Sequence, residues 1–280
     1  MLALLFPGQG SQTDGDRAEV ERLAPDLLQL VLAEMGEDPF LRVGESTRYA
    51  QPAIFVTSLA RLRGAAPLSG RASVMAGHSL GEITALTAAG ALTAEDALRL
   101  VVERGRLMAA AQAGGMIVVK ASIDDAARVA EAQGLAVAND NAPGQVVLSG
   151  TADRLDQAVA AARDLGLRAT RLGVSGAFHS PLMQPARAAF AAVLDDTDFR
   201  KPAMPVYCCA TAAPFTDPRR QLAEALTAPV RWREVVHAMH RRGVRTFAEV
   251  GPGRVLDGLV RRTLPEATRT PLQVEEPARA

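Results

Sequence analysis

The chain has 280 residues, of which 48% are hydrophobic and 22% charged, which is ordinary for a globular protein large enough to carry an inserted domain. Lysine plus arginine and aspartate plus glutamate both total 31, so the formal net charge is zero and neither nucleic acid nor an anionic membrane is expected as the main partner. No stretch approaches the roughly 20 apolar residues that cross a bilayer, and the apolar start is too short for a signal peptide. The only cysteines, Cys208 and Cys209, are adjacent, so they offer neither a disulfide framework nor the spacing of metal ligands. We therefore expect a cytoplasmic protein without a metal.

Short apolar runs alternate with helical patterns along most of the chain, which is typical of an α/β fold with a largely parallel sheet. The predicted strands of this sheet are 2–6, 72–76, 204–207 and 245–249. The predicted helices are 17–34, 52–65, 80–90, 94–112, 180–194 and 232–242. Thr93 is expected to cap the helix over 94–112, because Glu95 and Asp96 follow it in the first turn.

The middle of the chain has a different order of elements. Strands are predicted at 116–121, 135–139, 145–149 and 168–172, and helices at 123–133 and 152–165. This βαββαβ order is the ferredoxin-like pattern. We therefore predict a core made of residues 1–114 and 175–280, with residues 115–174 as an inserted small domain.

A candidate nucleophile lies between the second predicted strand and the helix that follows it. Gly77-His78-Ser79-Leu80-Gly81 fits the G-x-S-x-G pattern of a nucleophile elbow, and it has the strand–turn–helix context that such an elbow requires. The elbow would expose the hydroxyl of Ser79 above the amino end of a helix. The alternative is a glycine-rich turn without chemistry.

A nucleophilic serine needs a base, and four histidines are available. His179 lies in a loop of small residues before a helix, a setting more typical of catalytic residues than a helix face is. His78 is expected to point away from the serine hydroxyl, whereas His237 and His240 have the spacing of a partly exposed helix face. We predict His179 as the base; a structural histidine remains the alternative.

Carboxylates that lie between Ser79 and His179 include, in the proposed small domain, Asp140, Asp153, Asp156 and Asp164. None is an evident partner for the imidazole. We therefore predict a Ser–His dyad whose imidazole is oriented by a main-chain carbonyl rather than by a carboxylate.

Seven segments spread along the chain carry a family resemblance. They are Phe6–Gln12, Gln51–Ala53, Gly77–Glu82, Arg104–Met108, Asn141–Val147, Gly176–Met183 and Glu249–Gly253. In this order they resemble the malonyl-CoA:acyl carrier protein transacylases of fatty acid and polyketide synthesis, essentially from end to end. The resemblance implies an α/β-hydrolase-like core with a ferredoxin-like insert, in agreement with the pattern of elements.

The resemblance also implies a role for each matching residue. Ser79 would be acylated and His179 would activate it, with the carbonyl near Val250 orienting the imidazole. The backbone amides of Gln9 and Leu80 would form the oxyanion hole, in which one donor is worth about 2.7–4 kcal/mol of transition-state stabilisation.

Arg104 is implied as the group that holds the free carboxylate of the malonyl group. It follows Ser79 by 25 residues, on the helix after the elbow helix, so the two side chains can face one cleft. A guanidinium can hold a carboxylate through two hydrogen bonds; the alternative is an ordinary surface arginine. Gln51 is expected to line the same pocket, unless it is only a neighbour of a helix cap.

The implied reaction moves a malonyl group from malonyl-CoA to an acyl carrier protein through a malonyl-serine, with no cofactor beyond the coenzyme A thioester. Two features resemble the family members that use malonyl rather than methylmalonyl groups: Ala177-Phe178-His179 and the Leu80 after the serine. A serine esterase or thioesterase and a non-catalytic docking module are the alternatives. Fatty acid synthesis, polyketide synthesis and malonate decarboxylase maturation all remain open as pathways, and a monomer is expected. Three arginines are candidates for steering the carrier protein: Arg168, Arg171 and Arg187.

Overall fold

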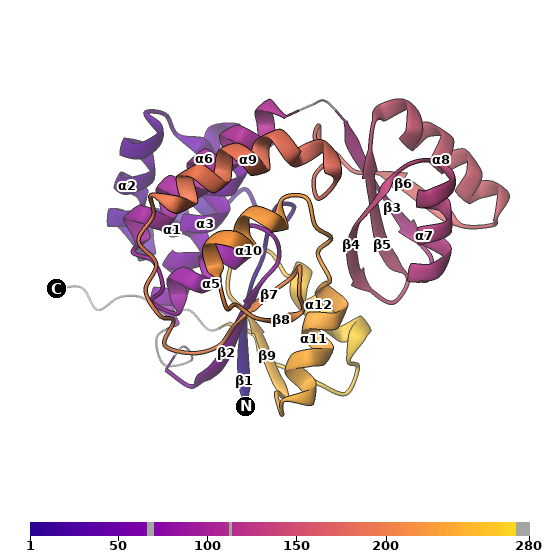
Figure 1. The fold of residues 1–280 in the computed structure, drawn as a ribbon. Coiled ribbons are helices and arrows are strands. Elements are labelled where there is room, and N and C mark those ends of the chain that lie inside the picture. The colour runs from indigo at the N-terminus through magenta and orange to yellow at the C-terminus, as the bar shows by residue number, and fades with distance from the viewer. Residues whose placement is uncertain (66–69, 112–113, 273–280) are drawn as a thin grey trace.

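Two β-sheets organise the protein (Figure 1). The computed structural model describes residues 1–65, 70–111 and 114–272. Residue 112 of the predicted helix 94–112 lies outside the described residues, and so do residues 273–280 of the predicted core. The larger sheet has the strand order β10-β9-β1-β2-β7-β8. Its strands are β1 (Leu2–Phe6), β2 (Ala72–Gly77), β7 (Val206–Cys208), β8 (Ala213–Pro214), β9 (Thr246–Glu249) and β10 (Thr268–Arg269).

Neighbouring strands of the larger sheet run parallel except β7 and β8, which form an antiparallel pair. The α/β fold with a largely parallel sheet is therefore confirmed, and the four predicted core strands occur within two residues of their expected bounds. β8 and β10 were not predicted, because two residues are too few to show an alternating pattern.

Helices cover both faces of this sheet (Figure 1). Their bounds are α1 (Asp16–Leu23), α2 (Pro25–Met35), α3 (Thr47–Gly64), α5 (Gly81–Ala88), α6 (Ala94–Ala110), α9 (Gln184–Asp195), α10 (Pro218–Ala225), α11 (Trp232–Arg241) and α12 (Val255–Thr263), with short 3₁₀ turns η1 (Pro39–Arg42) and η2 (Pro181–Met183). The sequence did not predict α10 or α12. No helix in the described part of the chain has the length and apolar character to cross a membrane.

Two helix boundaries differ from the prediction for identifiable reasons. The predicted helix 17–34 is broken at Ala24 (φ −154°), because Pro25 disfavours helical backbone in the residue before it and opens a new helix. α3 begins at Thr47 instead of residue 52, since the Ser46 hydroxyl accepts a hydrogen bond from the Arg48 N–H and Pro52 is accommodated inside the helix. The predicted cap of α6 is confirmed, with the Asp96 N–H donating to the Thr93 hydroxyl.

The side chains of β1 alternate between two hydrophobic cores. Leu4 and Phe6 pack in the cluster under α3, α5 and α6, whereas Ala3 and Leu5 pack with Trp232 and the apolar faces of α11 and α12. Because β1 lies in the middle of the sheet and is buried on both faces, its continuous apolar run fits a central strand of a parallel sheet.

The second sheet is antiparallel, with the strand order β4-β5-β3-β6. Its elements in chain order are β3 (Gly115–Lys120), α7 (Ile123–Ala132), β4 (Ala136–Ala142), β5 (Gln145–Gly150), α8 (Ala152–Asp164) and β6 (Arg168–Arg171). One face, with Ile117 and Val119, packs on α7 and α8. The other face carries Met116 and Val147, which join the main core.

Backbone and side-chain bonds attach the second sheet to the rest of the protein. The Asp140 N–H donates to the Val230 carbonyl, and the Val230 N–H donates to the Ala138 carbonyl. The Arg233 guanidinium bonds the Asp140 carboxylate over 2.9 Å. The end of β4 is therefore held against the segment before α11, and this brings the second sheet over the carboxyl ends of β1 and β2.

Candidate active site

The turn between β2 and α5 holds Ser79 in left-handed backbone conformation, with φ of 53°. A Cβ atom at Gly77 would lie 1.8 Å from the Gly81 carbonyl carbon, and one at Gly81 would lie 2.0 Å from the Phe6 carbonyl oxygen. Only glycine fits at these two positions, which is the physical basis of the G-x-S-x-G pattern. The strained turn projects the Ser79 hydroxyl from the end of the sheet.

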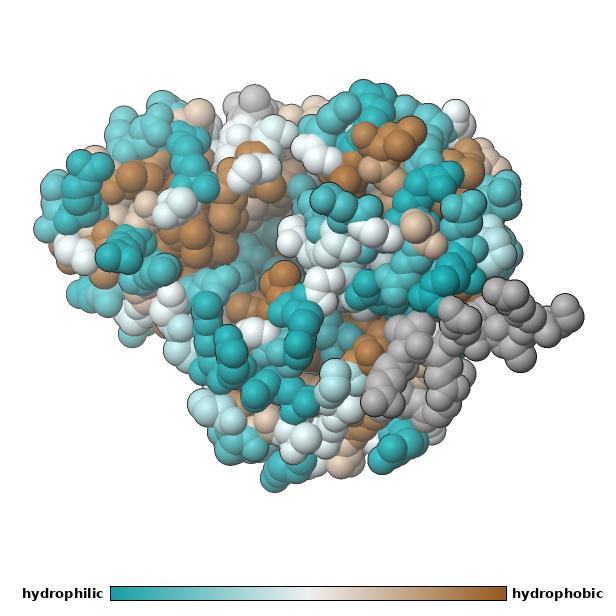
Figure 2. All heavy atoms as spheres, turned by 180° about the vertical axis from the view of Figure 1, so that it is seen from behind, coloured by the Kyte–Doolittle hydropathy of each residue, from teal (hydrophilic) through white to brown (hydrophobic). Residues whose placement is uncertain are grey.

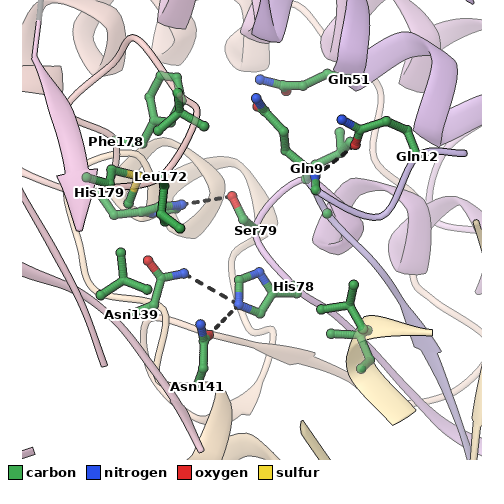
Figure 3. A pocket seen from close by; sticks show the side chains of 18 of the residues that line it. Gln9, Gln12, Gln51, His78, Ser79, Asn139, Asn141, Leu172, Phe178 and His179 are labelled. Atoms are coloured by element: carbon green, nitrogen blue, oxygen red, sulfur yellow. Dashed lines mark hydrogen bonds between the residues drawn. The ribbon is translucent and has the colours of Figure 1, made fainter. Parts of the chain in front are cut away.

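The Ser79 hydroxyl oxygen lies 2.8 Å from Nε2 of His179, as the sequence led us to expect (Figure 3). His179 also has left-handed backbone, with φ of 55°, and its side chain is buried. Its Nδ1 faces the main-chain carbonyls of Ala225 at 2.8 Å and Ala228 at 3.2 Å. Because carbonyls only accept, Nδ1 carries the proton, and Nε2 is left free to accept the serine proton.

The orienting carbonyl was expected near Val250, and this expectation is wrong. The groups of that turn are used elsewhere: the Val250 N–H donates to the Leu5 carbonyl, and the Gly251 carbonyl accepts from Arg61. The turn follows β9, which β1 separates from β2 and the elbow. The last residue of α10 and the segment after this helix reach His179 instead. Every residue carries a carbonyl, so no sequence signal could have identified Ala225.

The imidazole of His179 is contacted by main-chain carbonyls, and the aspartates considered above that form ion pairs have other partners. Asp140 bonds Arg233 and Asp156 bonds Arg171. His179 bonds only the serine and the two carbonyls among the described residues. His237 and His240 lie half-buried on α11, away from the pocket.

Arg104 and Gln51 are brought together at the serine. Arg104 extends from α6 with only 4% of its surface exposed, and its guanidinium donates to the Ser79 hydroxyl over 3.0 Å and to the Gln51 side-chain oxygen over 2.6 Å. The Gln51 amide nitrogen donates to the Thr47 hydroxyl over 2.8 Å, which turns its oxygen toward Arg104. Gln51 therefore does more than line the pocket: it holds the guanidinium in place.

The loop after β1 passes close to the elbow. Phe6 pairs with Gly77 in the parallel register of β1 and β2, so Gln9 and Leu80 each follow the paired position by three residues. A Cβ atom at Gly8 would lie 2.6 Å from the His78 carbonyl oxygen, which shows how closely the two loops approach. Within the described residues, neither the Gln9 nor the Leu80 N–H donates to a protein acceptor. Both residues line the pocket at Ser79.

The pocket above Ser79 has a volume of about 390 Å³ and is shared by the two sheets. The larger sheet and its helices contribute the elbow, His179 and α12, and the smaller one contributes Met116, Asn139 and Asn141. The Asn141 side-chain oxygen lies 2.8 Å from Nε2 of His78, so His78 points toward β4 and away from the serine hydroxyl (Figure 3). Figure 2 shows a hollow between the two lobes, with apolar residues along its wall.

Burial sets the charges at the site. It lowers the pKa of His179 to about 3, assisted by the positive charge of Arg104, so the imidazole is neutral at physiological pH. Burial also lowers the pKa of Arg104 to about 10, against the opposing effect of Glu82, so the guanidinium keeps its charge. The site can therefore deprotonate a serine beside a fixed cation. No group of His, Cys, Asp and Glu in the described chain is placed to hold a metal ion.

Comparison with known proteins agrees with this chemistry. The family described as acyl transferase domain matches residues 27–276. The polyketide biosynthesis protein ThaF of Burkholderia thailandensis is 41% identical over 95% of this chain, which spans 24% of that protein. The malonyl CoA-acyl carrier protein transacylase of Bacillus subtilis is 38% identical over 93% of this chain and 90% of its own length.

The fold is also shared with solved structures. The crystal structure of a malonyl-CoA:acyl carrier protein transacylase from Xanthomonas oryzae superposes with a TM-score of 0.91 at 34% identity, covering 98% of this chain and 94% of that one. The acyltransferase domain from the second module of the salinomycin polyketide synthase superposes with a TM-score of 0.87 at 35% identity, covering 96% and 68%.

Replacing the first elbow glycine should destabilise the protein. In Gly77→Ala the new methyl group meets backbone that cannot move aside, so we expect a loss of about 3 kcal/mol or more in the free energy of unfolding. Gly258→Ala is the control, since Gly258 is in α12 with open space where its Cβ would be, and alanine there should be neutral or stabilising by up to about 1 kcal/mol. Chemical denaturation measures both, and equal midpoints for Gly77→Ala and wild type would refute the packing argument.

The lowered pKa of His179 predicts an unusual pH profile. A depressed pKa means that the proton-accepting form of the base is present at every pH above about 3. Labelling of Ser79 by a neutral fluorophosphonate should therefore proceed at nearly constant rate from pH 5 to pH 7. A histidine with an ordinary pKa near 6.5 would instead slow the reaction by about 30-fold at pH 5. Timed labelling followed by mass spectrometry decides between the two profiles.

Proposed function

The chain belongs to the acyl transferase domain family, and from that premise we propose that it transfers a malonyl group from malonyl-CoA to the phosphopantetheine thiol of an acyl carrier protein. The observation that carries the proposal is the buried guanidinium of Arg104, 3.0 Å from the Ser79 hydroxyl. A fixed cation at the nucleophile suits an acyl group that has a carboxylate of its own. The relatives named as malonyl transacylases support the same substrate.

The first half-reaction forms a malonyl ester on Ser79. The serine oxygen attacks the thioester carbonyl while its proton passes to Nε2 of His179, and the Ala225 carbonyl stabilises the resulting imidazolium through Nδ1. The N–H groups of Gln9 and Leu80 stabilise the oxyanion. This role is supported by two observations: the loops that carry the two residues lie side by side, and neither N–H donates to a protein acceptor among the described residues. Collapse of the intermediate releases coenzyme A, whose sulfur takes the proton back from His179.

The second half-reaction repeats these steps with the carrier-protein thiol in place of the serine. His179 takes the thiol proton, the sulfur attacks the malonyl ester, and Ser79 leaves with the proton returned by His179. Neither step requires oxidation, reduction or a Lewis acid, so we propose that the enzyme uses no cofactor beyond its thioester substrates.

The malonyl carboxylate would bind Arg104, which Gln51 holds from the far side. Phe178 lines the pocket beside the dyad and is nearly buried. Because its ring would crowd a methyl branch on the acyl group, we expect a preference for malonyl over methylmalonyl of about 1–3 kcal/mol. Hydrolysis by an esterase or thioesterase has no support among the relatives described above, which are named for transacylation or polyketide synthesis.

We also propose the finer description of the fold, an α/β-hydrolase-like core of residues 1–114 and 175–280 with a ferredoxin-like insert of residues 115–174. The βαββαβ order and the antiparallel β4-β5-β3-β6 sheet support the insert. The elbow between a parallel strand and a helix supports the core. A monomeric state and a cytoplasmic location remain predictions of the sequence.

Malonyl-CoA should leave a covalent adduct on Ser79. Intact-mass spectrometry after brief mixing is expected to show the added mass of one malonyl group, and peptide mapping should place it on Ser79. Ser79→Ala should acquire no mass. An adduct that persists in Ser79→Ala would place the nucleophile elsewhere.

Removal of the guanidinium should change which acyl group is accepted. Arg104→Ala leaves the malonyl carboxylate without a partner in a desolvated pocket, at a cost of about 2–5 kcal/mol, or at least about 30-fold in kcat/KM. Acetyl-CoA has no carboxylate and should lose much less. Arg99→Ala on the same helix is the control, because Arg99 is exposed and pairs with Asp96. Equal losses for the two substrates would contradict the proposed role.

A further inference from the structure

The carboxylate of Glu82 is buried beneath the nucleophile elbow, and the reaction described above does not use it. Glu82 lies in the first turn of α5, three residues after Ser79, and only 1% of its surface is exposed. One oxygen accepts the Cys209 N–H over 2.7 Å. No arginine, lysine or histidine of the described chain lies within ion-pair distance.

A buried carboxylate without a direct cation is costly, so its nearest charge matters. Burial raises the pKa of Glu82 to about 7, against the opposing effects of the Cys209 N–H and of the positive charge of Arg104 on the adjacent helix α6. Glu82 in turn raises the pKa of Arg104. The two buried groups, on the neighbouring helices α5 and α6, therefore interact without a direct contact, and above pH 7 the ionised Glu82 partly balances the charge of the guanidinium.

The other titratable groups around Glu82 keep one protonation state near neutral pH. Burial raises the pKa of the Cys208 thiol to about 12 and that of Cys209 well above its usual value, so both stay protonated. Burial lowers the pKa of His78 and of His179, so both rings stay neutral. Among these groups around Glu82, a change in charge near pH 7 therefore belongs to Glu82 itself.

A malonyl carboxylate at Arg104 would place a second anion beside the same cation. Two anions that share one buried cation cannot both stay ionised without cost, so one of them is protonated more easily. The malonyl group keeps its charge through direct contact with the guanidinium, whereas Glu82 loses the effect of a cation that is now neutralised. We propose that Glu82 takes up a proton from solvent when the malonyl carboxylate pairs with Arg104. The inference rests on the proposed function.

This coupling makes malonyl recognition depend on pH, whereas acetyl recognition does not. Glu82 binds a proton more tightly in the malonyl complex than in the free enzyme, so affinity is full below the pKa of the free enzyme. Above it, affinity falls by up to tenfold per pH unit until the pKa of the complex is reached. Glu82 thus acts on the substrate only through Arg104, as a residue that sets the selectivity for a charged acyl group.

Calorimetric titration of Ser79→Ala measures the proton directly, because this variant binds thioesters without being acylated. Titrations at pH 8 in buffers of different ionisation enthalpy give the number of protons taken up. We expect a value approaching one proton for each malonyl-CoA and close to zero for acetyl-CoA, which carries the same coenzyme phosphates. No uptake with malonyl-CoA would overturn the proposal.

Glu82→Gln in the Ser79→Ala background keeps an acceptor for the Cys209 N–H but removes the charge. Proton uptake should disappear, and malonyl-CoA affinity should become independent of pH between 7 and 9. Glu103→Gln is the matched control, since Glu103 precedes Arg104 on α6 and pairs with Arg106 outside the pocket; it should leave the uptake unchanged. Uptake that persists in Glu82→Gln would assign the proton to another group and refute the role of Glu82.

A second measurement avoids the Glu82 variant in case it fails to fold. For the wild-type enzyme, the ratio of kcat/KM for malonyl-CoA to that for acetyl-CoA should fall about tenfold per pH unit above pH 7; a constant ratio would refute the inference. Failure of the proposed function is recognised separately, because no malonyl adduct would then form on Ser79. An adduct without proton uptake would leave the transferase in place and remove only the role of Glu82.

Discussion

The close approach of the Gly77 and Gly81 backbones is the constraint on which the site depends. It allows β2 to turn into α5 within three residues and forces Ser79 into left-handed conformation. The hydroxyl then projects from the carboxyl edge of the sheet, where it meets His179 and Arg104. Gly8 and the β1–β2 register bring the Gln9 loop to the same edge. A side chain at Gly77 or Gly81 would push these groups apart and so prevent the reaction at Ser79.

Desolvation then determines what the assembled groups can do. It keeps the imidazole of His179 neutral and able to accept a proton, although an ordinary histidine would be partly charged near pH 6.5. It leaves Arg104 charged because an arginine starts from a much higher pKa. It brings Glu82 near its midpoint at neutral pH. One physical effect thus produces a base, a fixed cation and a titratable anion around a single serine.

The smaller sheet completes the site because it is firmly attached. The backbone bonds between β4 and Val230, together with the Arg233–Asp140 pair, hold the end of β4 over the elbow. Strand alternation then turns Asn139 and Asn141 toward His78 (Figure 3), whereas Asp140 faces Arg233. The pocket is therefore a property of the two sheets together. Its shape depends on an interface between segments that are nearly one hundred residues apart in the chain.

The sequence by itself determined the features whose causes are local. The apolar run of β1, the Thr93 cap of α6 and the glycines around Ser79 each depend on neighbouring residues, and each was found where predicted. The tertiary structure alone decided which distant groups meet. Ala225 supplies the carbonyl for His179 in place of the turn at Val250, and Cys209 supplies the N–H for Glu82. Backbone carbonyls and amides are the same at every residue, so only the packing of the sheets could select these two.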